Sequence, residues 1–179
     1  MTTLEWKRRQ EQECFAVKGP GAAEWLLAQG LRIPTQSNTW AAVAAQGSGS
    51  EALMIARLGT SEFFLDESSP APVIAGLAHA LRERPAGVYP VLRQDWGFVL
   101  AGAGSDAVLA EVCNVPFASL TAETQPIVMT MMVGVAVLVL LQAASQGRAY
   151  HVWCDPTFGP YLAETIAAVV AGHAGRSGD

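Results

Sequence analysis

The residues of this sequence that could perform chemistry most directly lie in two glycine-rich turns. Gly102, Gly104 and Ala107 match the pattern G-x-G-x-x-G/A between an expected strand and an expected helix. In dinucleotide-binding folds, such a turn brings backbone N–H groups against a pyrophosphate at the helix N-terminus. An earlier copy, Gly19–Glu24, has Glu24 where the third small residue belongs. Neither copy is followed by the short strand-helix-strand alternation of a Rossmann unit. We therefore interpret both as helix-entry turns, with a small dinucleotide-binding module as an alternative.

Side chains for metal binding or nucleophilic catalysis are scattered. The three histidines and three cysteines have no metal-ligand spacing, and we expect the cysteines to be reduced thiols. Ser61 and Ser105 lack the G-x-S-x-G pattern of a nucleophile elbow. Glu62 and Asp66 share one face of an expected strand, but charged ends of a hairpin are usually solvated. We therefore predict no catalytic, cofactor-binding or metal-binding residue.

Tryptophan is the residue type that points to a partner. The chain has five tryptophans, and aromatic side chains are enriched where proteins meet. Trp6 lies in a polar N-terminal leader and Trp40 in an expected loop, so these two are the candidate subunit-interface residues. The sequence is equally compatible with a fold in which both side chains pack back onto their own core.

The elements that must position these residues occur twice. Phe15 and Gly19–Gly21 recur as Phe98 and Gly102–Gly104, each time followed by an amphipathic helical pattern, two strand-like runs and another helix. The predicted fold is α+β, a duplicated strand-helix-strand-strand-helix unit with largely antiparallel sheets. The predicted boundaries are an N-terminal leader at 1–13, a first half at 14–85 with a flexible loop at 46–50, a second half at 86–174, and a flexible tail at 175–179.

The longest apolar run, Ile127–Leu141, is interrupted only by Thr130 and Gly134. It is shorter than the roughly 20 residues that a helix needs to cross a bilayer. Valines alternate with alanine and leucine along it, so both faces are apolar. This pattern predicts one strand in the middle of a sheet that is covered on both sides.

The composition narrows the classes of function. With 179 residues and 51% hydrophobic residues, the chain can bury a full core, which excludes a disordered protein. Only 15% of residues are charged and the net charge is -5, which argues against a nucleic-acid partner. A mean hydropathy of +0.27 favours a surface partly buried against other subunits. Because the polar segment Met1–Arg9 lacks the apolar stretch of a signal peptide, we expect a cytoplasmic protein.

Several short groups of residues occur in a distinctive order and spacing. They are Phe15, Lys18–Ala22 and Trp25–Leu26; Pro34, Asn38 and Trp40; Arg57–Gly59, Glu62–Phe63 and Leu65; Tyr150–Asp155; and Tyr161–Leu162. Together they resemble the gamma subunit of heterotetrameric sarcosine oxidases, which is itself similar to part of the folate-binding aminomethyltransferase (glycine-cleavage T-protein) fold. The resemblance runs from about Phe15 to Ala171.

This resemblance implies a complex that oxidatively demethylates an N-methylated amino acid or amine. FAD, FMN and NAD would be held by larger, alpha- and beta-like partner subunits, with tetrahydrofolate as the one-carbon acceptor there. Aminomethyltransferases use an acidic residue in the early sheet, whereas the matching stretch Leu53–Arg57 has no carboxylate. We therefore expect an accessory, non-catalytic subunit that binds no cofactor alone and contacts neither nucleic acid nor membrane. The alternative is a stand-alone tetrahydrofolate-binding or one-carbon-transfer protein.

Overall fold

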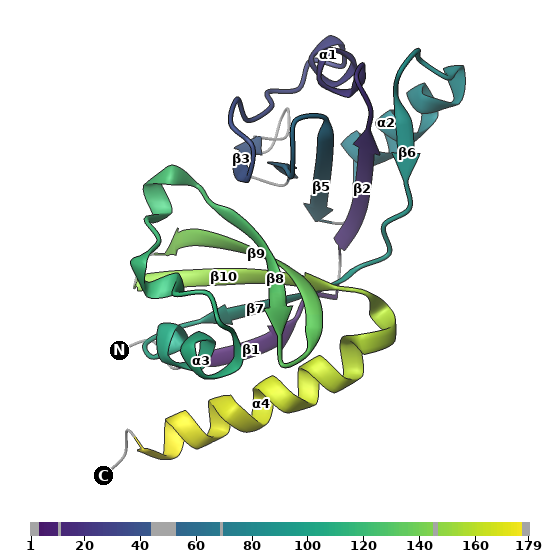
Figure 1. Ribbon diagram of the computed structural model, residues 1–179. Coiled ribbons are helices and arrows are strands. Elements are labelled where there is room, and N and C mark those ends of the chain that lie inside the picture. The colour runs from purple at the N-terminus through teal and green to yellow at the C-terminus, as the bar shows by residue number, and fades with distance from the viewer. Residues whose placement is uncertain (1–3, 11, 44–52, 69, 145–146, 177–179) are drawn as a thin grey trace. The chain divides into compact units, whose positions relative to one another are not determined.

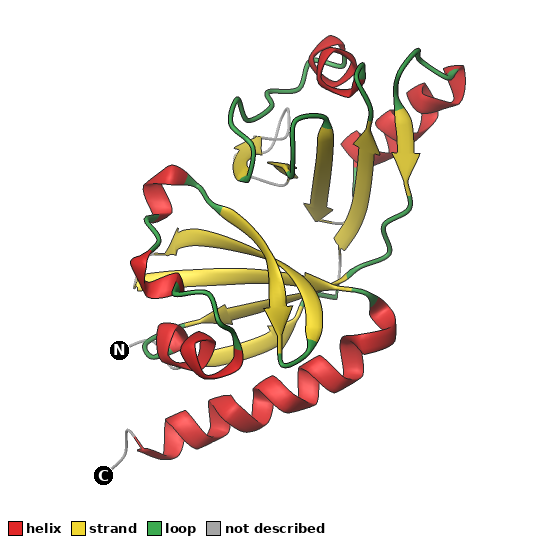
Figure 2. Cartoon of the chain, viewed as in Figure 1, coloured by secondary structure: helices red, strands yellow, loops and turns green. Residues whose placement is uncertain are grey.

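The chain forms two compact units, Glu11–Gln94 and a second that combines Met1–Gln10 with Asp95–Asp179. The computed structural model describes residues 4–10, 12–43, 53–68, 70–144 and 147–176. Each unit contains one antiparallel sheet whose core face is covered by helices (Figures 1 and 2). The fold class is therefore α+β, as the sequence predicts.

The unit Glu11–Gln94 has a five-stranded sheet in the order β3-β4-β5-β2-β6, and all its neighbouring strands are antiparallel. Alternate residues of the central strands, such as Val17, Ile55 and Leu65, face a core that Leu26 and Leu77 of the two helices complete. Its elements are β2 (Gln12–Lys18), α1 (Ala22–Ala28), β3 (Thr39–Val43), β4 (Leu53–Arg57), β5 (Glu62–Ser68), α2 (Pro72–Ala80), the short 3-10 helix η1 (Leu81–Glu83) and β6 (Tyr89–Val91).

The other unit has the strand order β1-β7-β10-β9-β8, again antiparallel throughout. Val108 and Leu109 of one helix and Leu162 and Ile166 of another pack on the sheet face that includes Val139. Its elements are β1 (Glu5–Arg8), β7 (Trp96–Ala101), α3 (Ser105–Val112), η2 (Phe117–Ser119), η3 (Ala122–Thr124), β8 (Ile127–Met132), β9 (Val135–Ala144), β10 (Gly147–Cys154), η4 (Pro156–Phe158) and α4 (Gly159–Arg176).

The two units repeat one topology. In each, a strand and a helix are followed by three strands and a second helix, and β3-β4-β5-β2 has the same spatial order as β8-β9-β10-β7. The fifth strand differs in origin, because β6 follows its unit's second helix whereas β1 precedes both repeats. The predicted duplication is therefore correct, but each repeat has one more strand than the sequence pattern indicates.

The additional strands lie in two segments where the structure differs from the sequence-based prediction. Trp40 lies in β3, which we had predicted to be a loop, and β3 pairs with β4. The run Ile127–Leu141 is a hairpin and not one strand, because Val133 and Gly134 both adopt positive φ (43° and 86°) and turn the chain. The interior position holds for β9, which lies between β10 and β8 and is buried continuously from residue 137 to residue 141.

The terminal segments also differ from expectation. Glu5–Arg8, assigned to a separate leader, forms β1 and pairs with β7. Residues 175 and 176, assigned to a flexible tail, end α4. The predicted loop at 46–50 and the last three residues lie outside the described residues.

Candidate functional site

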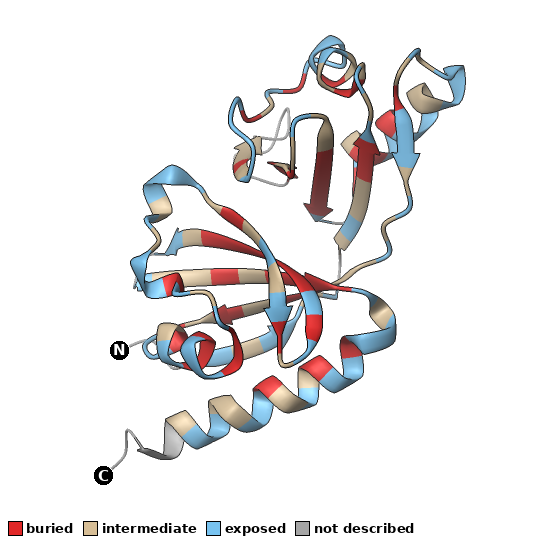
Figure 3. Ribbon diagram, viewed as in Figure 1, coloured by how far each residue is buried: buried red, intermediate tan, exposed pale blue. Residues whose placement is uncertain are grey.

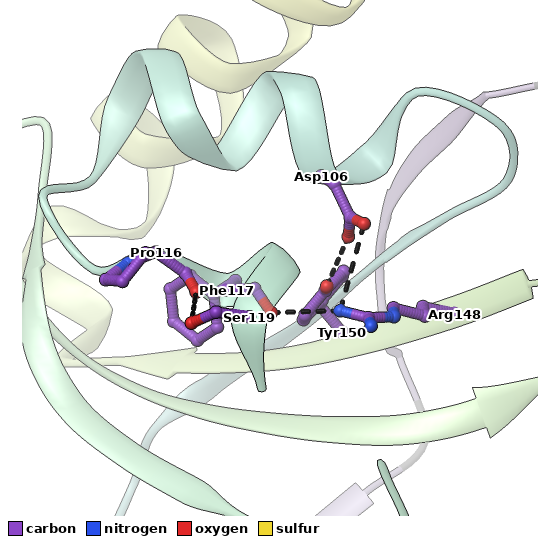
Figure 4. A network of polar contacts seen from close by, with 6 residues as sticks. All are labelled: Asp106, Pro116, Phe117, Ser119, Arg148 and Tyr150. Carbon is purple, nitrogen blue, oxygen red and sulfur yellow. Dashed lines mark hydrogen bonds and ion pairs between the residues drawn. The ribbon is translucent and has the colours of Figure 1, made fainter. Parts of the chain in front are cut away.

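The most concentrated group of polar side chains joins α3 to β10 (Figure 4). The Tyr150 hydroxyl donates a short hydrogen bond to Oδ1 of Asp106. Nη1 of Arg148 lies 3.8 Å from Oδ2 of the same carboxylate and donates to the Phe117 carbonyl at 2.9 Å. The Phe117 ring meets the Tyr150 ring edge-on at 5.6 Å, so η2 holds the phenol from a second side. We name Asp106, Arg148 and Tyr150 the α3–β10 cluster.

The second glycine-rich turn places Asp106 in this cluster. Gly102 and Gly104 adopt φ of 102° and 93°, which is the left-handed region that favours glycine and lets the chain turn directly from β7 into α3. Asp106 is therefore in the first turn of the helix, where a carboxylate is stabilised by the helix dipole. Arg148 and Tyr150 share one face of β10 because they are two residues apart.

Electrostatics keep the phenol neutral. Burial, and then the hydrogen bond to Asp106, raises the pKa of Tyr150 to about 12. The pKa of Arg148 is raised as well, chiefly by its interaction with Tyr150 and then by the charge of Asp106. At neutral pH Tyr150 is thus a protonated phenol that donates to Asp106, and these contacts link α3 to β10.

A hollow of about 350 Å³ lies beside Arg148. Its volume is at the small end of the range for ligand sites, roughly 300–1,000 Å³. None of its described lining residues is aromatic, and the Arg148 guanidinium is the planar group on which a ring could stack. The lining residues are 118–123, Ala143, Gly147 and Arg148.

The first glycine-rich turn is occupied by its own chain. A Cβ on Gly19 would lie 2.3 Å from the Gly87 carbonyl oxygen, and one on Gly21 would lie 2.5 Å from the Ala86 carbonyl oxygen. The Gly21 N–H donates to the Gly87 carbonyl at 3.0 Å. These glycines therefore permit close backbone packing, which supports the helix-entry interpretation. In the second turn the Asp106 carboxylate stands at the helix start, where a negative charge disfavours a phosphate.

Trp6 contacts residues of its own unit, and Trp40 is buried. The Trp6 ring stacks on Phe98 with centroids 4.7 Å apart, and its Nε1 donates to the Ala163 carbonyl at 3.2 Å. Trp40 is 7% exposed. The structure places them in different units, Trp6 in β1 and Trp40 in β3.

Asp66 and Glu67 of β5 are buried, contrary to the prediction of a solvated hairpin end, whereas Glu62 is partly exposed. Asp66 is 3% exposed, and the Cys14 thiol lies 3.6 Å from its Oδ2. The sequence analysis missed Glu67, which is fully buried and accepts hydrogen bonds from the N–H groups of Val73 (3.2 Å) and Ile74 (2.8 Å). The sequence does contain one signal for this role. The N-cap residue of α2 is Ala71, whose side chain cannot cap a helix, so another residue must do so.

Within the described ranges, no group of three or more His, Cys, Asp or Glu side chains could hold a metal ion. Among the helices that the structure describes, none has the length and the apolar character needed to span a membrane.

Comparison with known proteins finds similarity in structure. No model of a protein family matches the sequence, and no curated protein matches it either. A heterotetrameric sarcosine oxidase from Corynebacterium sp. U-96, in complex with pyrrole 2-carboxylate, matches with a TM-score of 0.75 and 15% identity, over 96% of this chain and 85% of that chain. The glycine cleavage system aminomethyltransferase T from Bartonella henselae matches with a TM-score of 0.65 and 17% identity, over 92% of this chain.

The match covers only 45% of the aminomethyltransferase, so the chain spans about half the length of that protein. Identities this low establish a shared fold and leave activity and partners open. The duplicated topology, the antiparallel sheets and both matches agree with the predicted fold. The chain has the α+β fold found in heterotetrameric sarcosine oxidase and in the folate-binding aminomethyltransferase T.

Proposed function

We propose that this chain is a small, gamma-like accessory subunit of a sarcosine-oxidase-type flavoenzyme complex that oxidatively demethylates an N-methylated amino acid or amine. The observation that carries the proposal is the extent of the two structural matches. The chain corresponds to 85% of a chain of a heterotetramer but to 45% of the aminomethyltransferase. A nearly whole-chain match favours a discrete subunit over a fragment of a transferase.

The chemistry of the chain supports an accessory role. The α3–β10 cluster holds a phenol whose pKa is about 12 and a carboxylate already paired with a guanidinium. Gly87 packs against the first glycine-rich turn, and the Asp106 carboxylate stands at the start of the helix after the second; both disfavour a bound phosphate. We therefore assign FAD, FMN, NAD and tetrahydrofolate to larger alpha- and beta-like partner subunits, in a complex that is cytoplasmic.

A second candidate function is stand-alone tetrahydrofolate binding or one-carbon transfer. Its support is the aminomethyltransferase match, which extends over 92% of this chain. The share of the aminomethyltransferase that the chain spans, 45%, counts against it.

The test is native mass spectrometry of the tagged chain, purified gently from its own host, together with an absorbance scan. We expect a yellow assembly that contains at least two larger subunits, shows flavin absorbance and releases formaldehyde from an N-methylated amine, with sarcosine as the first substrate tried. The second candidate predicts a colourless lone chain whose melting temperature rises on addition of tetrahydrofolate. That result would overturn the subunit proposal.

A further inference from the structure

A second hollow, of about 710 Å³, lies in the unit Glu11–Gln94 between the end of α2 and β6. Arg84 adopts a left-handed conformation (φ 52°) that ends η1, and the chain then turns toward Tyr89 at the start of β6. Most of this segment is exposed, as the pale blue of η1 and β6 in Figure 3 shows. We name it the arginine hollow; its lining includes Leu81, Arg82, Arg84, Pro85, Val88 and Tyr89.

The fold makes no use of the two guanidinium groups of this hollow. Arg82 and Arg84 are exposed, and neither forms an ion pair or a side-chain hydrogen bond with any residue that the structure describes. Arg57 and Arg148, in contrast, are tied to backbone carbonyls at 2.7 to 3.3 Å. Glu83 lies between the two free arginines in sequence but does not line the hollow. In a chain with net charge -5, this is a local concentration of unpaired positive charge.

Apolar surface borders the same arginines. Tyr89 is 56% exposed and Leu92 is 84% exposed, the highest value among the large apolar side chains described. The Tyr89 ring packs against the backbone of Gly19, where an added Cβ would lie 2.7 Å from its Cδ2. Arginine and tyrosine are enriched among the residues that dominate binding energy at protein interfaces, and a pre-positioned ring loses little entropy on binding.

We infer that the arginine hollow is a docking surface for an acidic segment of a larger partner subunit, in which carboxylates alternate with apolar side chains. The carboxylates pair with Arg82 and Arg84, whose planar guanidinium groups can bind a carboxylate through two parallel hydrogen bonds. The apolar side chains cover Tyr89 and Leu92. The identity of the partner rests on the proposed function. The chemistry of the segment that binds is inferred from the residues of the hollow itself.

The chemistry is tested on the full chain alone by NMR titration with a synthetic peptide that alternates glutamate and leucine. We expect shifts of backbone amides confined to residues 81–92 and their neighbours in β2. Binding should weaken about 30-fold or more in the double variant Arg82→Glu/Arg84→Glu. It should persist in Arg32→Glu, which makes the same charge change at another exposed arginine of the same unit. A peptide with glutamine in place of glutamate should not bind. Shifts elsewhere, or binding that is indifferent to the double variant, would overturn the inference.

The partner is tested in the assembly purified from the host. The double variant should release the larger subunits while its melting temperature stays that of the wild type, and Arg32→Glu should retain them. If a flavin-containing assembly forms and the double variant keeps it, the inference fails and the proposed function stands. If no larger subunit is found but the acidic peptide still binds at 81–92, the proposed function fails and the hollow remains an acidic-segment site. Loss of self-association in the double variant would show that a second copy of this chain is the occupant, which contradicts the inference.

Discussion

At the scale of the residue, Tyr150 shows how a buried polar side chain couples stability to pH. Its pKa of about 12 exceeds the ordinary value of 10.0, so the unfolded chain releases the phenolic proton first. The stabilisation is therefore complete below pH 10 and decreases as the pH rises toward 12, by on the order of 2 kcal/mol. In Tyr150→Phe, the free energy of unfolding should fall less between pH 10 and pH 12 than in the wild type. It should also be lower at pH 7, because the variant lacks the hydrogen bond to Asp106. Urea unfolding between pH 7 and 12 measures both effects, with the exposed Tyr89→Phe as the matched control; equal alkaline slopes in the wild type and Tyr150→Phe would contradict this account.

Trp40 is a buried residue whose environment differs from the loop that the sequence predicts. It lies in β3 and is 7% exposed, and removing a buried tryptophan side chain costs about 3–5 kcal/mol. We therefore expect Trp40→Ala to cause a marked loss of stability, seen as lower hydrogen-exchange protection in β3 and β4. A variant with wild-type protection there would contradict a stabilising role of the indole. A contact between Trp40 and another subunit stays a prediction.

At the scale of the element, α2 depends on a side chain that precedes it. Glu67 accepts hydrogen bonds from Val73 and Ile74 and supplies the cap that Ala71 cannot. Glu67→Gln removes the charge that favours the helix N-terminus and retains one acceptor, so we expect a loss of about 1–2 kcal/mol in the free energy of unfolding. Glu62→Gln, on the same strand but partly exposed, should change it by less than about 0.5 kcal/mol. Chemical denaturation of both variants measures these changes in the free energy of unfolding. Equal losses in the two variants would contradict the capping role of Glu67.

The hairpin between β8 and β9 has a residue type that does not suit its turn. Val133 has φ of 43°, a conformation that a β-branched residue adopts only under constraint, and its N–H and carbonyl are held by Val112 and Tyr161. We expect Val133→Asn to stabilise the protein by about 1 kcal/mol. Gly134→Ala should destabilise it by a similar amount, although the space around Gly134 is open, because its φ is 86°. Thermal melts should therefore move in opposite directions for adjacent substitutions.

These two elements explain which parts of the fold could be predicted. The helix-entry glycines and the alternation of apolar residues are local signals, and they predicted the duplication, the α+β class and the buried interior of β9. The turn at Val133 is imposed by contacts with Val112 and Tyr161, which are distant in sequence, and no Asn-Gly or Asp-Gly signal marks it. The α3–β10 cluster could not be predicted either, because Asp106 and Tyr150 meet only after the strands have ordered.

At the scale of the whole molecule, the high apolar content becomes visible as exposed side chains on both units. Leu27, Tyr89 and Leu92 belong to one unit, and the other exposes Met129, Met131, Phe158 and Tyr161, each at least half exposed. Contiguous exposed apolar surface marks interaction sites, and Met129 and Met131 of one strand are the pair in this set that share a strand face.

The edge strand β8 provides the last prediction. β8 ends its sheet, and Met129 and Met131 lie on one of its faces with exposed fractions of 57% and 54%. Edge strands with apolar side chains are templates for pairing with another chain, and flexible methionines adapt to varied contacts. We therefore expect the isolated chain to self-associate in sedimentation velocity experiments, and Met129→Thr/Met131→Thr to shift it toward monomer without lowering its melting temperature. Leu27→Gln, an equally exposed site on the other unit, is the matched control and should leave the self-association unchanged. A wild-type chain that sediments as a single monomer at high concentration would show that β8 is protected in the free protein, and its methionines would then lose their role as a contact surface.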